Sequence, residues 1–157
     1  MIGQKGRAAT RVARTTVLTV ALVAVPVFAT AADRVVVQIG AVLATNTEVH
    51  FDTQLAGMRQ QLETIFHYTS YQLMKRENRD VGWGDPVNFE ILGGRFLRVM
   101  PKSLGGDRIS LNVLLRQNNR VLMDTDFSVR GKGMVMVGGP RHGNGVLILW
   151  IGAQAVP

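Results

Sequence analysis

A side-chain pattern with a period of two restricts most of this chain to strands. Successive side chains of a strand point to opposite faces of a sheet, so alternation of apolar and polar residues predicts a strand with one buried face. The pattern is clearest in two runs around Gln117-Asn118-Asn119, which predicts a turn between them. The apolar face is formed by Ile109, Leu111, Val113 and Leu115 on the first run and by Val121, Met123, Thr125, Phe127 and Val129 on the second. Residues 108–130 are therefore expected to form a hairpin.

Further strands are predicted on both sides of this hairpin. They cover residues 71–73, 87–91, 96–100, 134–137 and 146–151, with tight turns at Gly93-Gly94 and at Gly105-Gly106-Asp107. One helix interrupts the pattern, at about residues 53–66, where Leu55, Met58, Leu62, Ile65 and Phe66 form a single apolar stripe and Asp52 is placed to cap the first turn. The order predicts an α+β fold, with a mostly antiparallel sheet of about seven to eight strands and one amphipathic helix.

Two segments, residues 35–42 and 146–151, are apolar on both faces. One helix cannot cover both faces of so large a sheet, because antiparallel sheets usually leave one face wet. We therefore expect that the sheet curls towards a barrel or that an apolar strip stays open for a partner. The second alternative predicts that one of two triplets is partly exposed, which are Leu147, Leu149 and Ile151 on one face and Val146, Ile148 and Trp150 on the other.

The first 31 residues have the order of a secretory signal peptide. Lys5, Arg7, Arg11 and Arg14 precede an uncharged run at residues 15–29, and Ala29-Thr30-Ala31 provides the small side chains that a signal peptidase accepts. The alternatives are cleavage after Ala31, cleavage after Ala32, and retention of the run as a membrane anchor. We expect residues 32–157 to form one domain in the periplasm or outside the cell.

Composition narrows the function of the exported part. The whole chain has 18 basic and 11 acidic residues, and removing the four basic residues of the leader leaves 14 and 11, a net charge of +3. This small excess argues against a nucleic-acid partner and leaves acidic envelope polysaccharides open. The absence of cysteine excludes disulfides, thiol catalysis and cysteine-bound metals.

Two segments carry candidate binding residues. Residues 138–145 contain four glycines and read as a loop, which is either an anion cradle served by Arg141 and His142 or a flexible hairpin loop. Trp83, between Gly82 and Gly84, either stacks on a sugar or a partner or forms a lid over the core. With the strand residues Leu147, Leu149, Trp150 and Ile151, these are the candidate interaction residues.

No catalytic, cofactor or metal site is predicted. The histidines at positions 50, 67 and 142 lack the close pairing of a zinc site. Asp124 and Asp126 share a strand face, which suits either a cation or a solvated surface. No serine nucleophile motif or paired catalytic carboxylates are visible.

Residues 124–153 resemble the closing part of the secretin family of outer-membrane channels. The resemblance rests on Thr125-Asp126-Phe127-Ser128-Val129, a short turn, Met134-Val135-Met136-Val137-Gly138-Gly139 and a strong final strand. It implies a hairpin that ends in a Val-x-Gly-Gly pattern, and no channel activity is carried over. The exported part as a whole is similar to small exported bacterial proteins of unknown function.

The sequence therefore favours an exported protein-interaction or assembly module, accessory to an envelope complex, that binds a protein partner or itself. The alternative is a cell-envelope sugar-binding protein or hydrolase. An enzyme should gather polar groups in one cleft, whereas a binding module should expose an apolar edge or patch.

The leader gives the first testable prediction. Protein recovered from the envelope or medium of an exporting host should begin at Ala32 or Asp33, because the small-residue site lies just before them. Intact-mass measurement and N-terminal sequencing check this, and an exported form that keeps Met1 would show the prediction to be wrong.

Overall fold

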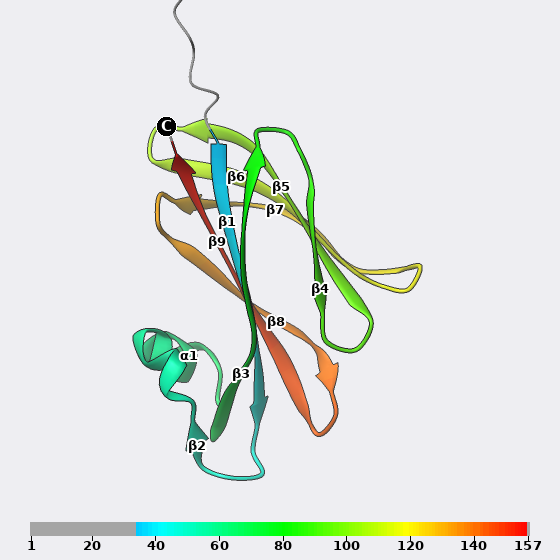
Figure 1. Ribbon diagram of the computed structural model, residues 1–157. Coiled ribbons are helices and arrows are strands. Elements are labelled where there is room, and N and C mark those ends of the chain that lie inside the picture. The colour runs from blue at the N-terminus through cyan, green and yellow to red at the C-terminus, as the bar shows by residue number, and fades with distance from the viewer. Residues whose placement is uncertain (1–33, 157) are drawn as a thin grey trace, which may run out of the picture. The chain divides into compact units, whose positions relative to one another are not determined.

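The computed structural model describes residues 34–156, so the predicted signal peptide lies outside the described residues. Within that range nine strands form two sheets (Figure 1). The elements are β1 (Arg34–Thr45), β2 (His50–Phe51), η1 (Thr53–Met58), α1 (Arg59–Ile65), β3 (Ser70–Gly82), β4 (Val87–Ile91), β5 (Arg95–Gly105), β6 (Arg108–Gln117), β7 (Arg120–Arg130), β8 (Met134–His142) and β9 (Gly145–Val156). The prediction of a strand-rich, mostly antiparallel fold with one helical segment is confirmed.

The two sheets have simple strand orders. Sheet A is β2-β3-β1-β9-β8, and sheet B is β4-β5-β6-β7. Every pair is antiparallel except the short parallel pair of β2 with β3. Both sheets are open, so neither the single sheet nor the barrel-like curl expected from the sequence is formed.

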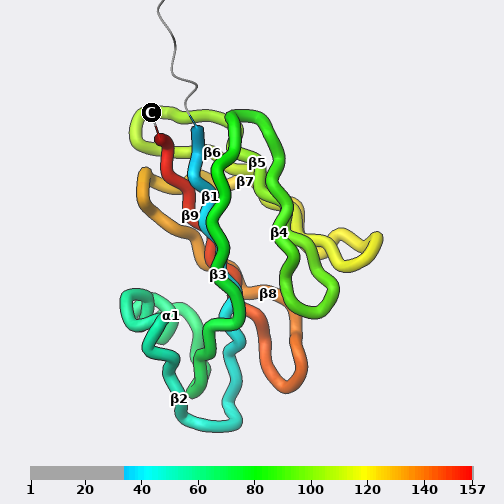
Figure 2. Tube along the Cα trace, viewed as in Figure 1, coloured from blue at the N-terminus to red at the C-terminus, as the bar shows by residue number. Residues whose placement is uncertain are grey.

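The first and last strands pair along almost their whole length at the centre of sheet A. The register runs from Arg34 opposite Val156 to Ala44 opposite Val146. Figures 1 and 2 show β1 and β9 side by side, with the C-terminal end of β9 next to the start of β1. The segments that are apolar on both faces are therefore central strands of a covered sheet.

Each face of sheet A packs against a different layer. One face meets sheet B and forms the main core, with Val35, Val37, Ile39, Leu147, Leu149 and Ile151 from β1 and β9 and Phe89, Leu97, Val99, Leu111 and Val113 from sheet B among its members. The other face holds a second cluster under the helical segment, formed by Val42, Ala44, Leu55, Met58, Leu62, Tyr71, Ile148 and Trp150. A second sheet thus provides the cover that one helix cannot give.

Most of the strip on β9 that was expected to be exposed is covered for the same reason. Leu147, Leu149 and Ile151 are fully buried against sheet B. On the other face Ile148 is fully buried and Trp150 is 4% exposed, whereas Val146 is half-buried. The sequence argument assumed one sheet with one helix, whereas the strands of this domain divide into two layers that cover each other.

Hydrogen bonds tie the helical segment to β3. The Asp52 carboxylate accepts from the backbone N–H of Gln54 (2.9 Å) and of Leu73 (3.1 Å), so the predicted cap also binds the neighbouring strand. The Tyr71 hydroxyl accepts from the N–H of Tyr68 and donates to the carbonyl oxygen of Phe66 (2.5 Å), at the helix C-terminus. Burial raises the pKa of Tyr71 above its ordinary value. These bonds satisfy backbone groups that helix ends leave unpaired.

Two boundaries differ from the expectation. The helix expected at residues 53–66 begins as the 3-10 segment η1 and becomes α-helical only at Arg59. Residues 138–145, expected to be a glycine-rich loop, instead continue β8 to His142 and begin β9 at Gly145. The turn is reduced to Gly143 and Asn144, with Gly143 at a φ of 57°. Gly138, Arg141 and His142 pair with β9 around a shift in register, and the glycines of this segment hide that pairing in the sequence.

Close approach of Trp150 to Gly40 gives a prediction. A Cβ added at Gly40 would lie 2.0 Å from Trp150 Nε1, so Gly40→Ala should lower the free energy of unfolding by about 1–3 kcal/mol through overpacking. Urea unfolding measures this. Gly57→Ala is the matched control, because a Cβ there has no neighbour within 4 Å, and it should be neutral or slightly stabilising.

The cause can be separated from a general effect of alanine. In a Trp150→Leu background the indole is gone, and Gly40→Ala should then cost less than in the parent. An equal cost in both backgrounds would contradict the proposed contact.

Candidate functional site

The outer face of sheet B, which points away from sheet A, has two halves of different character. In one half the polar groups pair with each other. Lys102 Nζ lies 2.9 Å from Asp126 Oδ2, and the Asn112 amide donates to Asp126 Oδ1 (2.9 Å) and Asp124 Oδ1 (3.2 Å). The Ser110 and Ser128 hydroxyls lie 3.3 Å apart. Hydrogen bonds from Lys102 and Asn112 lower the pKa of Asp126 below its ordinary value. The two aspartates are thus engaged by donors from the protein itself.

The other half is made of two apolar and two basic side chains in a checkerboard. Phe96 on β5 stands opposite Arg116 on β6, and Arg98 on β5 stands opposite Leu114 on β6. The two arginines therefore occupy one diagonal and the two apolar residues the other. We call these four residues the basic–apolar patch. Phe96 is 49% exposed, both arginines are exposed, and Leu114 is half-buried.

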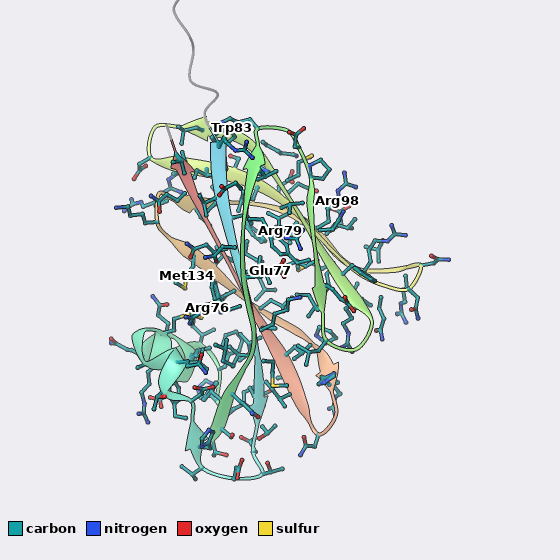
Figure 3. All side chains as sticks on the ribbon, viewed as in Figure 1. Arg76, Glu77, Arg79, Trp83, Arg98 and Met134 are labelled. Carbon is teal, nitrogen blue, oxygen red and sulfur yellow. The ribbon has the colours of Figure 1, made fainter. Side chains whose placement is uncertain are left out.

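The basic–apolar patch lines a concave part of the surface. The hollow encloses about 680 Å³ and is completed by residues at the start of β4 and in the β6–β7 turn, which are Pro86, Asn88, Asn118 and Asn119. Figure 3 shows Arg98 pointing away from β3, on the outer side of sheet B. The lining therefore combines an exposed aromatic ring, two guanidinium groups and three neutral amides.

Neither arginine of the basic–apolar patch forms an ion pair within residues 34–156, where no carboxylate oxygen lies within 4.0 Å of Arg98 or Arg116. Glu90 and Asp124 stand one strand further out, opposite Phe96 and Leu114. Among the described residues the two arginines are therefore exposed and unpaired, unlike Lys102 in the other half of the same face.

The β4–β5 turn sets which side chains reach this face. Gly93 and Gly94 adopt φ values of 75° and 67°, which glycine reaches without strain, and this tight turn places Phe89 opposite Leu97. Leu97 and Val99 are then fully buried, and Phe96 and Arg98 take the outer side. The sequence held a signal for this site, because the alternation of residues 95–99 predicts a solvent-exposed side chain at Phe96, and an exposed aromatic residue is a candidate for binding.

Arg95, at the start of β5, was also missed by the sequence reasoning. It lies on the inner side of the sheet and is 6% exposed. Its guanidinium donates to the carbonyl oxygen of Leu92 (2.9 Å) and across to that of Arg141 (2.8 Å). Arg95 therefore fastens the β4–β5 hairpin of sheet B to the β8–β9 hairpin of sheet A.

The structure does not bring the sequence-predicted interaction residues together. Trp83 is half-buried and packs against the main core, as a lid would. Trp83 follows the last residue of β3, Gly82, which pairs with Arg34 at the end of sheet A where β9 finishes at Val156. Arg141 and His142 lie at the opposite end of this sheet, where Arg141 pairs with Val146 near the start of β9. Leu147, Leu149, Trp150 and Ile151 are core residues. Their role in partner binding is untested, and only Arg141 and His142 offer accessible polar groups.

A row of charges closes the gap between β3 and β4, where the two sheets meet. Lys75, Glu77 and Arg79 all point from β3 towards sheet B, and Figure 3 shows Glu77 and Arg79 between the two strands. Glu77 accepts from Arg79 Nε (2.7 Å) and lies 3.1 Å from Lys75 Nζ. The Arg79 guanidinium also sits 5.6 Å from the centre of the Phe89 ring. We call Lys75, Glu77 and Arg79 the seam, because they lie where β3 meets sheet B. Each of the three charges has a partner within the seam, which indicates a structural role.

Residues 34–156 contain neither a cluster of metal-ligating side chains nor a helix that could span a membrane. No group of three or more histidine, cysteine, aspartate or glutamate side chains in that range is placed to hold a metal ion. None of its helices has the length and apolar character needed to span a bilayer.

Comparison with known proteins gave one significant match. No protein-family model and no curated protein matches the chain. The cryo-EM structure of the T2SS secretin XcpQ from Pseudomonas aeruginosa is similar to it at 10% sequence identity with a TM-score of 0.40. The match covers 79% of this chain but only 59% of the secretin chain, so this chain spans less than two thirds of that protein.

The seam gives a prediction on pH. The hydrogen bond from Arg79, and then those from Lys75, hold the pKa of Glu77 below its ordinary value of 4.5. A carboxyl whose pKa is lowered by folding contributes stability above the unfolded-state pKa, and that stability is lost as the pH falls through the folded-state pKa. Glu77→Gln should therefore flatten the fall in the free energy of unfolding as the pH drops below 4.5.

Arg79→Met provides the matching variant, because it removes the main cause of the shift. It should flatten the same part of the curve, and adding it to Glu77→Gln should flatten the curve little further. Urea unfolding across the acid range measures all three proteins. Parent and Glu77→Gln curves of equal slope would contradict the assignment.

Proposed function

We propose that this chain is an exported protein-interaction module of the cell envelope, periplasmic or extracellular, and that it binds its partner through the outer face of sheet B. Export is supported by the signal-peptide order of residues 1–31. On this proposal residues 32–157 form the working domain. The rigid two-sheet core holds the basic–apolar patch in place.

The observation that carries the proposal is the half-exposed Phe96 ring in a concave, positively charged surface. Aromatic and arginine side chains are the residues that most often dominate the binding energy of protein interfaces, and they do so when a partner removes them from water. An exposed Phe is ordinary by itself. Its placement between two unpaired arginines, in a hollow, is what supports recognition of another molecule.

The alternative from the sequence was an envelope sugar-binding protein or hydrolase, and its main support was a stacking role for Trp83. Trp83 packs against the core instead, with only part of its side chain exposed. The exposed apolar group on the described domain that sits in a charged hollow is Phe96, on a broad sheet face. A broad face of this kind favours docking of a protein over the cleft that bond cleavage needs.

Replacing Phe96 tests the proposal. Phe96→Ser should abolish or strongly weaken capture of the partner from an extract of the source envelope, because a truncated interface anchor costs about 2 kcal/mol or more of binding. Immobilised parent and variant proteins are compared by quantitative mass spectrometry of what they retain.

Ile65→Ser is the matched control. Ile65 is 55% exposed, close to the value for Phe96, but lies on α1 beside sheet A. It should retain the same proteins as the parent. Equal capture by parent and Phe96→Ser, with both folded by circular dichroism, would show that this face is not the binding site.

A further inference from the structure

We infer that the basic–apolar patch receives an extended acidic segment of the partner protein, with a large apolar side chain between its carboxylates. The inference rests on the proposed function and adds the chemistry of the partner. Three features carry it, which are the unpaired arginines, their spacing and the amides around them.

Charge complementarity comes first. The eight residues that line the hollow include two arginines and no acidic residue. Both arginines are exposed, and no carboxylate of residues 34–156 lies within 4.0 Å of them. Lys102, by contrast, is paired with Asp126 on the same face. A planar guanidinium offers forked donors that fit a carboxylate, so the ligand groups expected here are carboxylates.

Spacing favours an extended chain. Side chains two positions apart on a strand, such as Phe96 and Arg98, lie roughly 6.5–7 Å apart. An extended ligand segment presents alternate side chains at the same interval, so an acidic and an apolar side chain can meet Arg98 and Phe96 in register, and Arg116 stands directly opposite Phe96 on β6. A helix would present its neighbouring side chains about 5–6 Å apart and at a different angle.

The rim of the hollow suits a peptide backbone. Asn88, Asn118 and Asn119 each carry an amide that can both donate and accept a hydrogen bond. A peptide offers donors and acceptors along its whole length, whereas an acidic polysaccharide offers no apolar side chain for Phe96 and Leu114. The patch alternates apolar and charged groups on the scale of single side chains, which matches a peptide.

Fluorescence anisotropy with defined probes tests the inference. The first probe is a fluorescein-labelled peptide in which Glu and Phe share one face of the extended chain at every second position, as in Glu-Ser-Phe-Ser-Glu, and the second has Lys in place of every Glu. Parent protein should bind the Glu probe, more weakly as salt is raised, and should not bind the Lys probe. The Arg98→Gln/Arg116→Gln variant should bind the Glu probe at least about tenfold more weakly.

A matched control lies on the same sheet face. Arg108 and Arg130 stand opposite each other at the other end of β6 and β7, and both are exposed. Arg108→Gln/Arg130→Gln removes the same amount of charge and should leave the affinity within about twofold. Equal weakening by both double variants would show attraction by net charge alone and overturn the inference.

Other occupants give different results. Polygalacturonate that binds with dependence on Arg98 and Arg116, while the Glu probe does not bind, would identify an acidic polymer and overturn the peptide assignment. Concentration-dependent self-association that Phe96→Ser removes, seen by sedimentation equilibrium, would identify a second copy of this chain. Equal binding of both probes would also overturn the inference.

Failure of the inference can be told apart from failure of the proposed function. If Phe96→Ser loses the envelope partner but Arg98→Gln/Arg116→Gln retains it, the face binds a partner that is not acidic. If both variants retain the partner, the proposed face itself is wrong.

Discussion

The pairing of β1 with β9 is the contact on which the rest of the domain depends. These strands join at the centre of sheet A over eleven register positions. Each contributes apolar side chains to both faces, so the pair links the main core under sheet B to the second cluster under the helical segment. Gly40 makes room for Trp150 at this junction, where the indole covers the strand backbone. Loss of the pairing would uncover both cores at once.

The sequence predicted the local structure well and the layering poorly. Alternation identified the hairpin of β6 and β7, and the stripe with Asp52 as cap identified the helical segment, because both signals depend on neighbouring residues. The division into two sheets depends on contacts between distant strands, which no local period reveals. The strand expected at residues 71–73 extends to Gly82 as β3, because its charged residues continue to pair with β1.

The candidate site was missed for a related reason. Phe96 and Arg98 lie far from Leu114 and Arg116 along the sequence, and the four become a group only when β5 pairs with β6. Half of the face around them is neutralised by contacts within the protein, and that contrast is visible only in three dimensions. The residues chosen from the sequence were the conspicuous ones, and most of them, Trp150 and Leu149 among them, serve the core.

The pairing of the first and last strands of the described residues also affects the order of folding. Arg34 opposes Val156, so the centre of sheet A lacks a strand until the last twelve residues are available. A chain that emerges from its N-terminus can form the hairpins of sheet B early, because their contacts are local, whereas closing β1 on β9 requires a loop almost as long as the domain. Both the main core and the second cluster are therefore completed only when residues 145–156 join sheet A as β9.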